Sequence, residues 1–453
     1  MAAGVVPEWQ IVVAVVAFVV TYVVIAWERL GIHKTIAALC GAAAVLLLKV
    51  VDWHEAAHGT DRVPGVDWNT IFLLIGMMVI VSITRHTGVF QYLAIRAAKT
   101  ARGRPILIII LLSSVTAVLS AFLDNVTTVL LIAPVTILLA ESLEVDPVPF
   151  LICEVLASNI GGTATLVGDP PNIMIASTAH FTFLDFIIHL TPIATIIFGC
   201  YVATIWLFLR KRITVADEKR QMVMAFDETR SLTDRPLLAK CGVVLGLTLV
   251  GFVVHGFLGL EPAVIALSGA ALLLLISRRH PSTHLEEVEW PTIFFFMGLF
   301  IMVSALVKAG VISFLARELM EATHDKIPAL AMVTLWFSAL ASSIVDNIPY
   351  VAAMNPLMLE VAQKTYPDIT SITELSHLPG VEALWWSLAL GACLGGNGTI
   401  IGASANVVVV GIAEKSGCHI GFVRFLKYGI PITIMSLVVS SVYIWLRYLV
   451  PHY

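Results

Sequence analysis

The chain has 453 residues, of which 58% are hydrophobic and 13% are charged, and its formal net charge is −4. Soluble domains carry about 25% charged residues, so this composition excludes a water-soluble globular protein and predicts a chain surrounded largely by lipid. The weak negative charge argues against a nucleic-acid partner. Six cysteines, scattered singly, predict neither a disulfide framework nor a zinc site.

Apolar segments of the first half predict membrane helices. The first segment lacks the basic start and the cleavage pattern of a signal peptide, so we expect it to remain as a helix. A later apolar run of 34 residues (106–139) is too long for one crossing and short for two, which predicts a re-entrant hairpin with Asp124 at its tip. The expected elements are crossings at Trp9–Trp27, Thr35–Val51 and Asn69–Thr84, a hairpin at Pro105–Ala140, a broken span at Val148–Ala179 and a crossing at Phe186–Leu209.

The chain contains an internal repeat. A polar, charged segment at 210–236 predicts a cytoplasmic linker between a first repeat at 1–209 and a second at 237–453. Several groups of residues recur in the same order on both sides of it, which generic hydrophobic resemblance does not explain. The matched positions include Trp68 and Trp290, Gly76 and Gly298, Asp124-Asn125 and Asp346-Asn347, Pro134 and Pro356, and Gly161-Gly162 and Gly395-Gly396.

Charge placement predicts that the two repeats are inverted. Five crossings in each repeat would give the copies opposite orientations. Segments 85–104 and 210–240 contain five and eight Lys/Arg, whereas loops 51–68 and 359–383 contain one each. The positive-inside rule places the basic segments in the cytoplasm and both termini outside. We therefore predict an all-α polytopic membrane protein of two inverted repeats, each with about five crossings, a re-entrant hairpin and a broken helix.

Each repeat places one aspartate inside an apolar stretch. A charge at the bilayer centre costs about 2.5–3.5 kcal/mol on insertion scales, so such a residue is expected to face a cavity and to serve a function. Asp124 and Asp346 are therefore predicted to bind an ion, a proton or a substrate. Aspartate is also a good helix N-cap, and capping alone is the alternative. The recurrence of the Asp-Asn pair in both repeats favours binding.

A second polar motif in each repeat predicts a discontinuous helix. Segments 159–172 and 395–406 combine glycine with hydroxyl and amide residues, and such paired breaks at mid-membrane are typical of transporter sites. Asp169 has no acidic counterpart in the second repeat, which suits proton coupling. Glu154 is also unmatched, and it is either a coupling group or a side chain near the membrane edge. The predicted binding residues are Asp124, Asn125, Thr127, Gly162, Thr163, Thr165, Asp169, Asn172, Asp346, Asn347, Asn397, Thr399 and Asn406.

At these motifs the sequence resembles a known family. Segments 120–129 and 159–172 resemble the signatures of the ArsB/NhaD permeases of the ion transporter superfamily, and the branch of the melanosomal P protein looks most similar. The resemblance implies a homodimer in which a transport domain moves past a scaffold like an elevator, with 68–104 and 290–320 in the scaffold. It also implies a soluble ATPase subunit as a possible partner.

The hairpin tips depart from one branch of that superfamily. The dicarboxylate carriers have Ser-Asn-Thr there, whereas this chain has Asp124-Asn125-Val126 and Asp346-Asn347-Ile348. An added carboxylate would repel an anion. It suits a cation, a proton or an uncharged polyhydroxyl acid such as arsenous acid.

The sequence therefore predicts a secondary active transporter in a bacterial inner membrane. The expected function is a proton-coupled antiporter that exports arsenite or antimonite, with no cofactor beyond a proton or Na⁺ as the coupling ion. The alternatives are a Na⁺/H⁺ antiporter and, below it, a Na⁺-coupled symporter of organic anions. An enzyme is not expected, because the chain has no His-Glu-x-x-His motif and no serine nucleophile elbow. A channel is disfavoured, because paired broken helices suit an alternating site.

Overall fold

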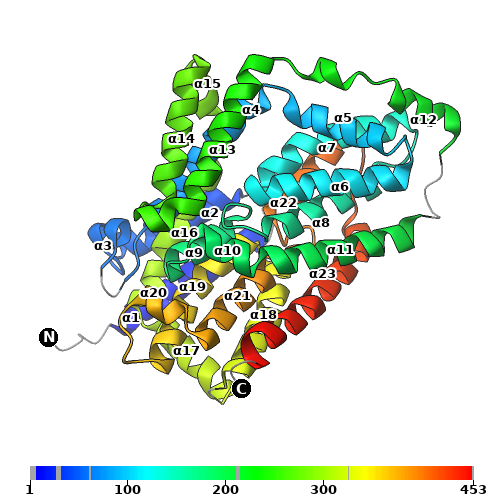
Figure 1. The fold of residues 1–453 in the computed structure, drawn as a ribbon. Coiled ribbons are helices and arrows are strands. Elements are labelled where there is room, and N and C mark those ends of the chain that lie inside the picture. Colours follow the sequence, from blue (N-terminus) through cyan, green and yellow to red (C-terminus); the bar gives the residue numbers. More distant parts are fainter. Residues whose placement is uncertain (1–6, 27–31, 61–62, 211–214, 325, 451–453) are drawn as a thin grey trace.

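The computed structural model describes residues 7–26, 32–60, 63–210, 215–324 and 326–450, and these residues form helices and loops without strands (Figure 1). Nine of the described helices are long and apolar enough to cross a membrane, and a pair bent by 114° could form a tenth span. This confirms the predicted polytopic all-α fold. Trp27, where the first predicted span ends, the single basic residue of loop 51–68 (Arg62) and the linker residues 211–214 lie outside the described ranges.

The helices of the first half follow the predicted order, except that the crossing predicted at Phe186–Leu209 begins at Thr191, while Phe186 lies in a separate short helix. The first half contains α1 (Glu8–Ala26), α2 (Lys34–Leu47), α3 (Trp53–His58), α4 (Trp68–Arg85), α5 (Val89–Thr100), α6 (Pro105–Phe122), α7 (Asn125–Ser142), α8 (Val148–Gly162), α9 (Pro170–Ala179), α10 (Phe183–His189) and α11 (Thr191–Leu209). The linker contains α12 (Asp217–Met224) and η2 (Glu228–Ser231). The second half contains α13 (Arg235–Leu258), α14 (Pro262–Ser277), α15 (Pro281–Glu286), α16 (Trp290–Lys308), α17 (Val311–Ala322), α18 (Ile327–Ile344), α19 (Asn347–Thr365), α20 (Ile372–Ser376), α21 (Pro379–Gly395), α22 (Ser404–Lys415), α23 (Phe422–Ile444) and the π-helical turn η3 (Trp445–Leu449).

One predicted crossing is shorter than expected. The sequence predicted a span over Thr35–Val51, but α2 has 14 residues and ends at Leu47. At 1.5 Å per residue, such a helix covers about 21 Å, which is less than the hydrocarbon core of a bilayer. Its counterpart α14 has 16 residues. Both helices belong to the shorter apolar helices of the fold, and Lys34 forms the first residue of α2.

Two helical hairpins carry the Asp-Asn pairs. Helices α6 and α7 meet at Leu123 and Asp124, both of which have extended backbone, and the arms are 18 residues long. Helices α18 and α19 meet in the same way at Val345 and Asp346. The polar turn falls where the sequence placed it, while the mid-membrane depth of the tips stays a prediction.

Glycines allow the broken helices to fold back on themselves. Helix α8 ends at Gly162, and a Cβ atom there would lie 2.6 Å from the carbonyl oxygen of Gly168. In the second half, a Cβ atom on Gly396 would lie 3.1 Å from the carbonyl oxygen of Gly402. The approach at Gly162 is too close for any Cβ atom, and the one at Gly396 is tighter than usual. The chain then re-enters a helix at α9 and at α22.

The two halves are interleaved. Helix α7 of the first half packs against α22 of the second, and α19 of the second half packs against α9 of the first. Gly76 on α4 lies against the backbone of Ala266 on α14, and Gly298 on α16 lies in the same way against Ala38 on α2. Each matched pair thus joins one half to the other, as two inverted copies would. The repeat boundaries at 1–209, 210–236 and 237–453 stay predictions.

The linker is held against α5, as Figure 1 shows near α12. Glu228 in η2 is buried and accepts hydrogen bonds from Lys99 and Arg96, both on α5. The ammonium of Lys99 and the guanidinium of Arg96 lower the pKa of Glu228 to about 2. Helix α5 in turn packs on both arms of the first hairpin. The linker is therefore attached, through α5, to the element that carries Asp124.

Candidate functional site

A cavity of about 540 Å³ lies between the two hairpin tips, α2 and α16. Its wall is mostly apolar, with side chains such as Leu74, Met78 and Ile348. The ionisable residues and hydroxyls that line it come from both halves of the chain. They are His33, Lys34, Asp124, Glu289, Thr292, Asp346 and Ser404.

Asp124 lies at one side of this cavity as the N-cap of α7. Its carboxylate accepts hydrogen bonds from the backbone N–H groups of Val126 (3.0 Å) and Thr127 (2.9 Å) and from the Thr127 hydroxyl. The side chain therefore satisfies free N–H groups at the start of the helix. Capping and cavity lining are both present, so the two interpretations offered by the sequence do not exclude each other.

Asp346 has a different set of partners. It also caps its helix, α19, but its bond to the backbone N–H of Ile348 is long, at 3.4 Å. Its Oδ2 atom instead receives the Ser404 hydroxyl at 2.5 Å and the Lys34 ammonium at 2.7 Å. An ion pair thus joins the start of α2 to the tip of the second hairpin. Such charge-assisted hydrogen bonds are stronger than neutral ones.

A third carboxylate faces the same cavity. Glu289 is the N-cap residue of α16, and its Oε2 atom accepts a hydrogen bond from the Thr292 hydroxyl at 3.2 Å. No ion pair to Glu289 is formed within the part of the chain that the structure describes. The cavity therefore has an excess of acidic groups over its single lysine.

Buried amides connect the two halves behind the cavity. Asn159 on α8 accepts a hydrogen bond from the side chain of Asn125 at 3.1 Å. The Asn159 amide donates to Asn397 at 2.9 Å and to Asn406 at 3.1 Å. All four side chains are almost completely buried. Because a buried amide needs partners, this network fixes the relative positions of the first hairpin and both broken helices.

The remaining predicted polar residues bond to backbone carbonyls of the broken segments. Asn172 donates to carbonyls of the first segment, and Asn406 does so in the second. The Thr165 hydroxyl donates to Ala121, and the Thr399 hydroxyl donates to Ser343 at 2.6 Å. Thr163 donates to the carbonyl of Asn159 at 2.8 Å. These bonds hold the broken segments against the hairpins, while a direct role in binding stays a prediction.

The two unmatched carboxylates lie in different places. Asp169 is buried at the start of α9, and both of its oxygens receive the Asn347 amide at 3.2–3.3 Å. Glu154 is 1% exposed and accepts a hydrogen bond from the Thr136 hydroxyl at 2.6 Å. The alternative that Glu154 lies near the membrane edge with its charge in water is therefore wrong, because α8 is enclosed by other helices.

The structure brings together only part of the predicted site at the cavity. Asp124 and Asp346 line the cavity itself, and Thr127 bonds to Asp124, whereas most of the other predicted residues lie in the protein behind it. Three residues of the cavity lining, Lys34, Glu289 and Ser404, were not among the predicted binding residues, and neither was Asn159 behind it. The available signal was a charged residue at the start of an apolar segment, which holds for Lys34 and Glu289. The sequence does not show which partner such a residue meets.

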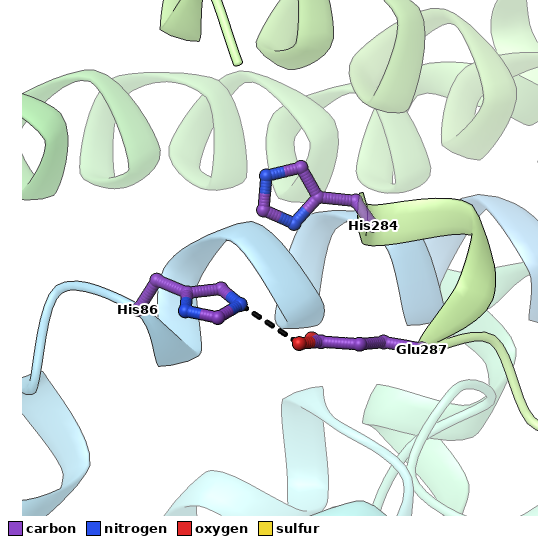
Figure 2. A group of neighbouring side chains, drawn as sticks. All are labelled: His86, His284 and Glu287. Carbon is purple, nitrogen blue, oxygen red and sulfur yellow. Dashed lines mark hydrogen bonds and ion pairs between the residues drawn. The ribbon is translucent and has the colours of Figure 1, made fainter. Parts of the chain in front are cut away.

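A separate polar cluster joins α4 to α15 (Figure 2). His86 Nε2 lies 2.9 Å from Glu287 Oε1, and potential metal-binding atoms of His86, His284 and Glu287 lie within 4.8 Å of one another. The Ser82 hydroxyl bonds to Glu287 at 2.6 Å and to His284 Nδ1 at 2.9 Å. Burial lowers the pKa of His284. None of these residues lines the cavity, and the cluster serves as a hydrogen-bonded junction between helices.

Comparisons with known proteins agree with a transporter. A family model described as citrate transporter matches residues 22–391. An uncharacterized transporter of Mycobacterium tuberculosis is 49% identical over 439 residues, which cover 97% of this chain and 99% of that protein. The human P protein is 33% identical over 98% of this chain, which spans 60% of that longer protein.

A solved structure shares the fold. The YdaH transporter of Alcanivorax borkumensis aligns with a TM-score of 0.56 over 94% of this chain and 98% of its own, at 14% identity. The similarity to the P protein agrees with the branch that the sequence motifs indicated. A narrower assignment to the ArsB/NhaD permeases stays a prediction.

Proposed function

Since the chain belongs to the citrate transporter family and is a membrane transporter, we propose that it is a proton-coupled antiporter that exports arsenite or antimonite. The observation that carries this proposal is the charge of the cavity. Three carboxylates, those of Asp124, Glu289 and Asp346, face it together with one ammonium, that of Lys34. This lining suits an uncharged polyhydroxyl acid, a small cation or a proton.

An organic anion fits the cavity less well. The family description names citrate, so a Na⁺-coupled anion symporter is the natural alternative. Lys34 is the only lysine among the described residues that line the cavity, and Asp346 already holds its ammonium at 2.7 Å. A citrate carboxylate would therefore meet two further acidic side chains, and the only other basic side chain described in the lining is that of His33. Like charges this close repel one another.

Coupling can arise from exclusive binding to one carboxylate. Arsenous acid would donate its hydroxyl hydrogens to the ionised side chain of Asp124. In the opposite orientation of the site, a proton would occupy the same carboxylate. Because the two cannot bind together, each return step carries a proton in one direction after the solute has moved in the other. The mostly apolar wall around Asp124 lowers the local dielectric constant, which strengthens these interactions.

Na⁺/H⁺ exchange is the second candidate, and one observation favours it. Asp346 is already paired with a monovalent cation in the form of the Lys34 ammonium. Carboxylate and hydroxyl oxygens such as those of Asp346 and Ser404 are also ligands that hard cations accept. The same chemistry at Asp124 would bind Na⁺ in exchange for a proton.

The assembly and the setting are also proposals. We propose a homodimer in a bacterial inner membrane that works by an elevator motion, and we keep a soluble ATPase as a possible partner. The family resemblance supports the dimer and the motion, and the mycobacterial relatives support the location. Helix α5, which was expected in the scaffold, packs on the first hairpin and would have to move with it.

Transport in liposomes tests the function. The purified protein would be reconstituted with a pH-sensitive dye inside, and arsenite, Na⁺ or citrate would be added outside under an imposed pH gradient. We expect arsenite to cause proton movement, and Asp124→Asn/Asp346→Asn to abolish it. Asp52→Asn/Asp234→Asn is the matched control, because these aspartates also cap helices but do not line the cavity.

The three solutes separate the candidates. Proton movement in response to Na⁺ but not to arsenite would favour Na⁺/H⁺ exchange over arsenite export. A response to citrate that needs Na⁺ would contradict the antiporter. Full activity of the double variant would show that neither hairpin carboxylate takes part in coupling.

A further inference from the structure

The two hairpin aspartates occupy equivalent places in the repeat, but only one has an ionic partner. Asp346 accepts an ion pair from Lys34 at 2.7 Å. No ion pair to Asp124 is formed among the residues that the structure describes, and its three hydrogen bonds all come from its own helix. The two carboxylates therefore differ in charge compensation although their backbone settings match.

Three contacts hold the ammonium of Lys34. Its Nζ atom donates to Asp346 Oδ2 at 2.7 Å and to the Ser404 hydroxyl at 2.6 Å, and it lies 5.0 Å from the centre of the Phe295 ring. Ser404 donates in turn to the same carboxylate oxygen, at 2.5 Å. The ammonium, hydroxyl and carboxylate form a closed triangle, and an aromatic face stabilises the cation further. This is the arrangement of an occupied cation site.

The sequence repeat explains why Asp124 lacks such a partner. Ala38 and Gly41 of α2 match Ala266 and Gly269 of α14, and this register places Pro262 opposite Lys34. Ser404 is likewise replaced by a proline, Pro170, in the first half. Proline offers neither an ammonium nor a hydroxyl. The cation and its hydroxyl partner are thus additions to one half of the site.

The origin of the contacts also matters. Lys34 comes from α2, Asp346 from the tip of the second hairpin and Ser404 from the start of α22. The side chain of Lys34 is 25% exposed, and all three residues line the cavity. The ammonium therefore sits where a dissolved cation entering the cavity would meet the carboxylate.

We propose that the Lys34 ammonium is a built-in counter-ion that fills the cation position of Asp346, so that, of the two tip aspartates, Asp124 alone is open to the transported solute or proton. The inference rests on the proposed function only in taking this cavity as the transport site. It makes the two halves unequal. A fixed cation satisfies the tip aspartate of the second half, and the tip aspartate of the first half exchanges its ligand with solution.

Removal of the ammonium should turn Asp346 into a site for a cation from solution. To observe this site alone, the Asp124→Asn background removes the other hairpin carboxylate. Purified protein in detergent would be heated in rising NaCl, with choline chloride keeping the ionic strength constant. A cation that binds the folded state raises Tm as its concentration increases.

The expected result depends on the second substitution. Asp124→Asn alone should show no Na⁺-specific shift, whereas Asp124→Asn/Lys34→Gln should show a rise in Tm that saturates. Asp124→Asn/Lys308→Gln is the matched control, because Lys308 is similarly exposed and paired, with Glu55, outside the cavity. The triple variant with Asp346→Asn should lose the shift again.

Several outcomes would overturn the inference. They are the absence of a Na⁺ shift in Asp124→Asn/Lys34→Gln, an equal shift in the Lys308 control, or a shift that survives Asp346→Asn. Lys34→Ser serves as a second neutral variant if the first does not fold. Folding of either variant only when Na⁺ is present would support the inference, and failure of both in every salt would contradict it.

This measurement separates the inference from the proposed function. It records binding and needs no transported solute. A Na⁺-dependent rise in Tm in the Lys34 variant, together with no proton movement in wild-type liposomes, would rule out the antiporter function and support the counter-ion role of Lys34. Proton movement in wild-type liposomes without a Na⁺-dependent rise in Tm in the Lys34 variant would support the antiporter function and rule out the counter-ion role.

Discussion

The tips of the two hairpins share a backbone plan and differ in charge. Asp124 and Asp346 each cap the second arm of a hairpin, and both line the cavity. Around Asp124 the partners are N–H and O–H groups of its own helix. Around Asp346 they include the ammonium of Lys34 and the hydroxyl of Ser404, from two other helices. The two copies therefore share the helix cap and differ in the side chains that set the charge.

Substitutions at the glycines that the two halves share should have the largest effect. A Cβ atom on Gly161 would lie 2.1 Å from the carbonyl oxygen of Ala117, and one on Gly395 would lie 2.5 Å from that of Ala339. We expect Gly161→Ala and Gly395→Ala to destabilise the protein by about 1–3 kcal/mol or more, since the obstructing atoms are backbone. The decrease in Tm, measured in detergent, should be larger for Gly161→Ala than for Gly395→Ala.

Gly246→Ala is the control for both substitutions. It lies within α13, and no atom approaches its added Cβ within 4 Å. Alanine forms helices better than glycine, by up to about 1 kcal/mol, so its Tm should hold or rise. Unchanged Tm values for all three variants would show that hairpins and broken helices are not packed as closely as described.

The second test concerns the amides of the broken helices. Asn172 donates to three backbone carbonyls and Asn406 to two. Replacing either residue with alanine leaves buried carbonyls without a donor, at a cost of about 1–3 kcal/mol. Both variants should lose more thermal stability than Asn69→Ala, whose side chain donates to Glu261 at the surface and accepts one backbone N–H, that of Ala263. Equal stability of all three would contradict a structural role for the buried amides.

The smallest expected effect lies in the linker between the halves. Lys99 and Arg96 lower the pKa of Glu228 to about 2, from a usual value of 4.5. A carboxylate with a lowered pKa adds stability that is complete above its unfolded pKa and is lost as the pH falls toward its folded pKa. Glu228→Gln should therefore lower Tm by a constant amount at pH 6–8. The difference should shrink as the pH falls from about 4.5.

Glu218→Gln, an exposed position on α12, is the control for the linker. It should leave Tm unchanged throughout this range. A Tm difference for Glu228→Gln that does not change between pH 7 and pH 3 would show that the ion pairs with α5 do not hold the linker.

Much of the fold follows from patterns within short stretches of sequence. The apolar run around Asp124 predicted a hairpin with a polar tip, and the glycines at 161–162 and 395–396 predicted the breaks. The partners of the site could not be predicted in this way. Lys34 and Asp346 are 312 positions apart, and Asn159 and Asn397 are 238 positions apart. Such contacts arise from how the two halves interleave, which local periodicity does not encode.

The most direct test compares the two aspartates under conditions where each acts alone. Asp124→Asn keeps the Lys34–Asp346 pair, and Lys34→Gln/Asp346→Asn removes that pair together with both of its charges. Proton movement in liposomes in response to arsenite or Na⁺ would be recorded for both variants. We expect proton movement with Asp124→Asn to fall to the level of empty liposomes, while Lys34→Gln/Asp346→Asn retains exchange. Activity in Asp124→Asn, with loss in the paired variant, would contradict it.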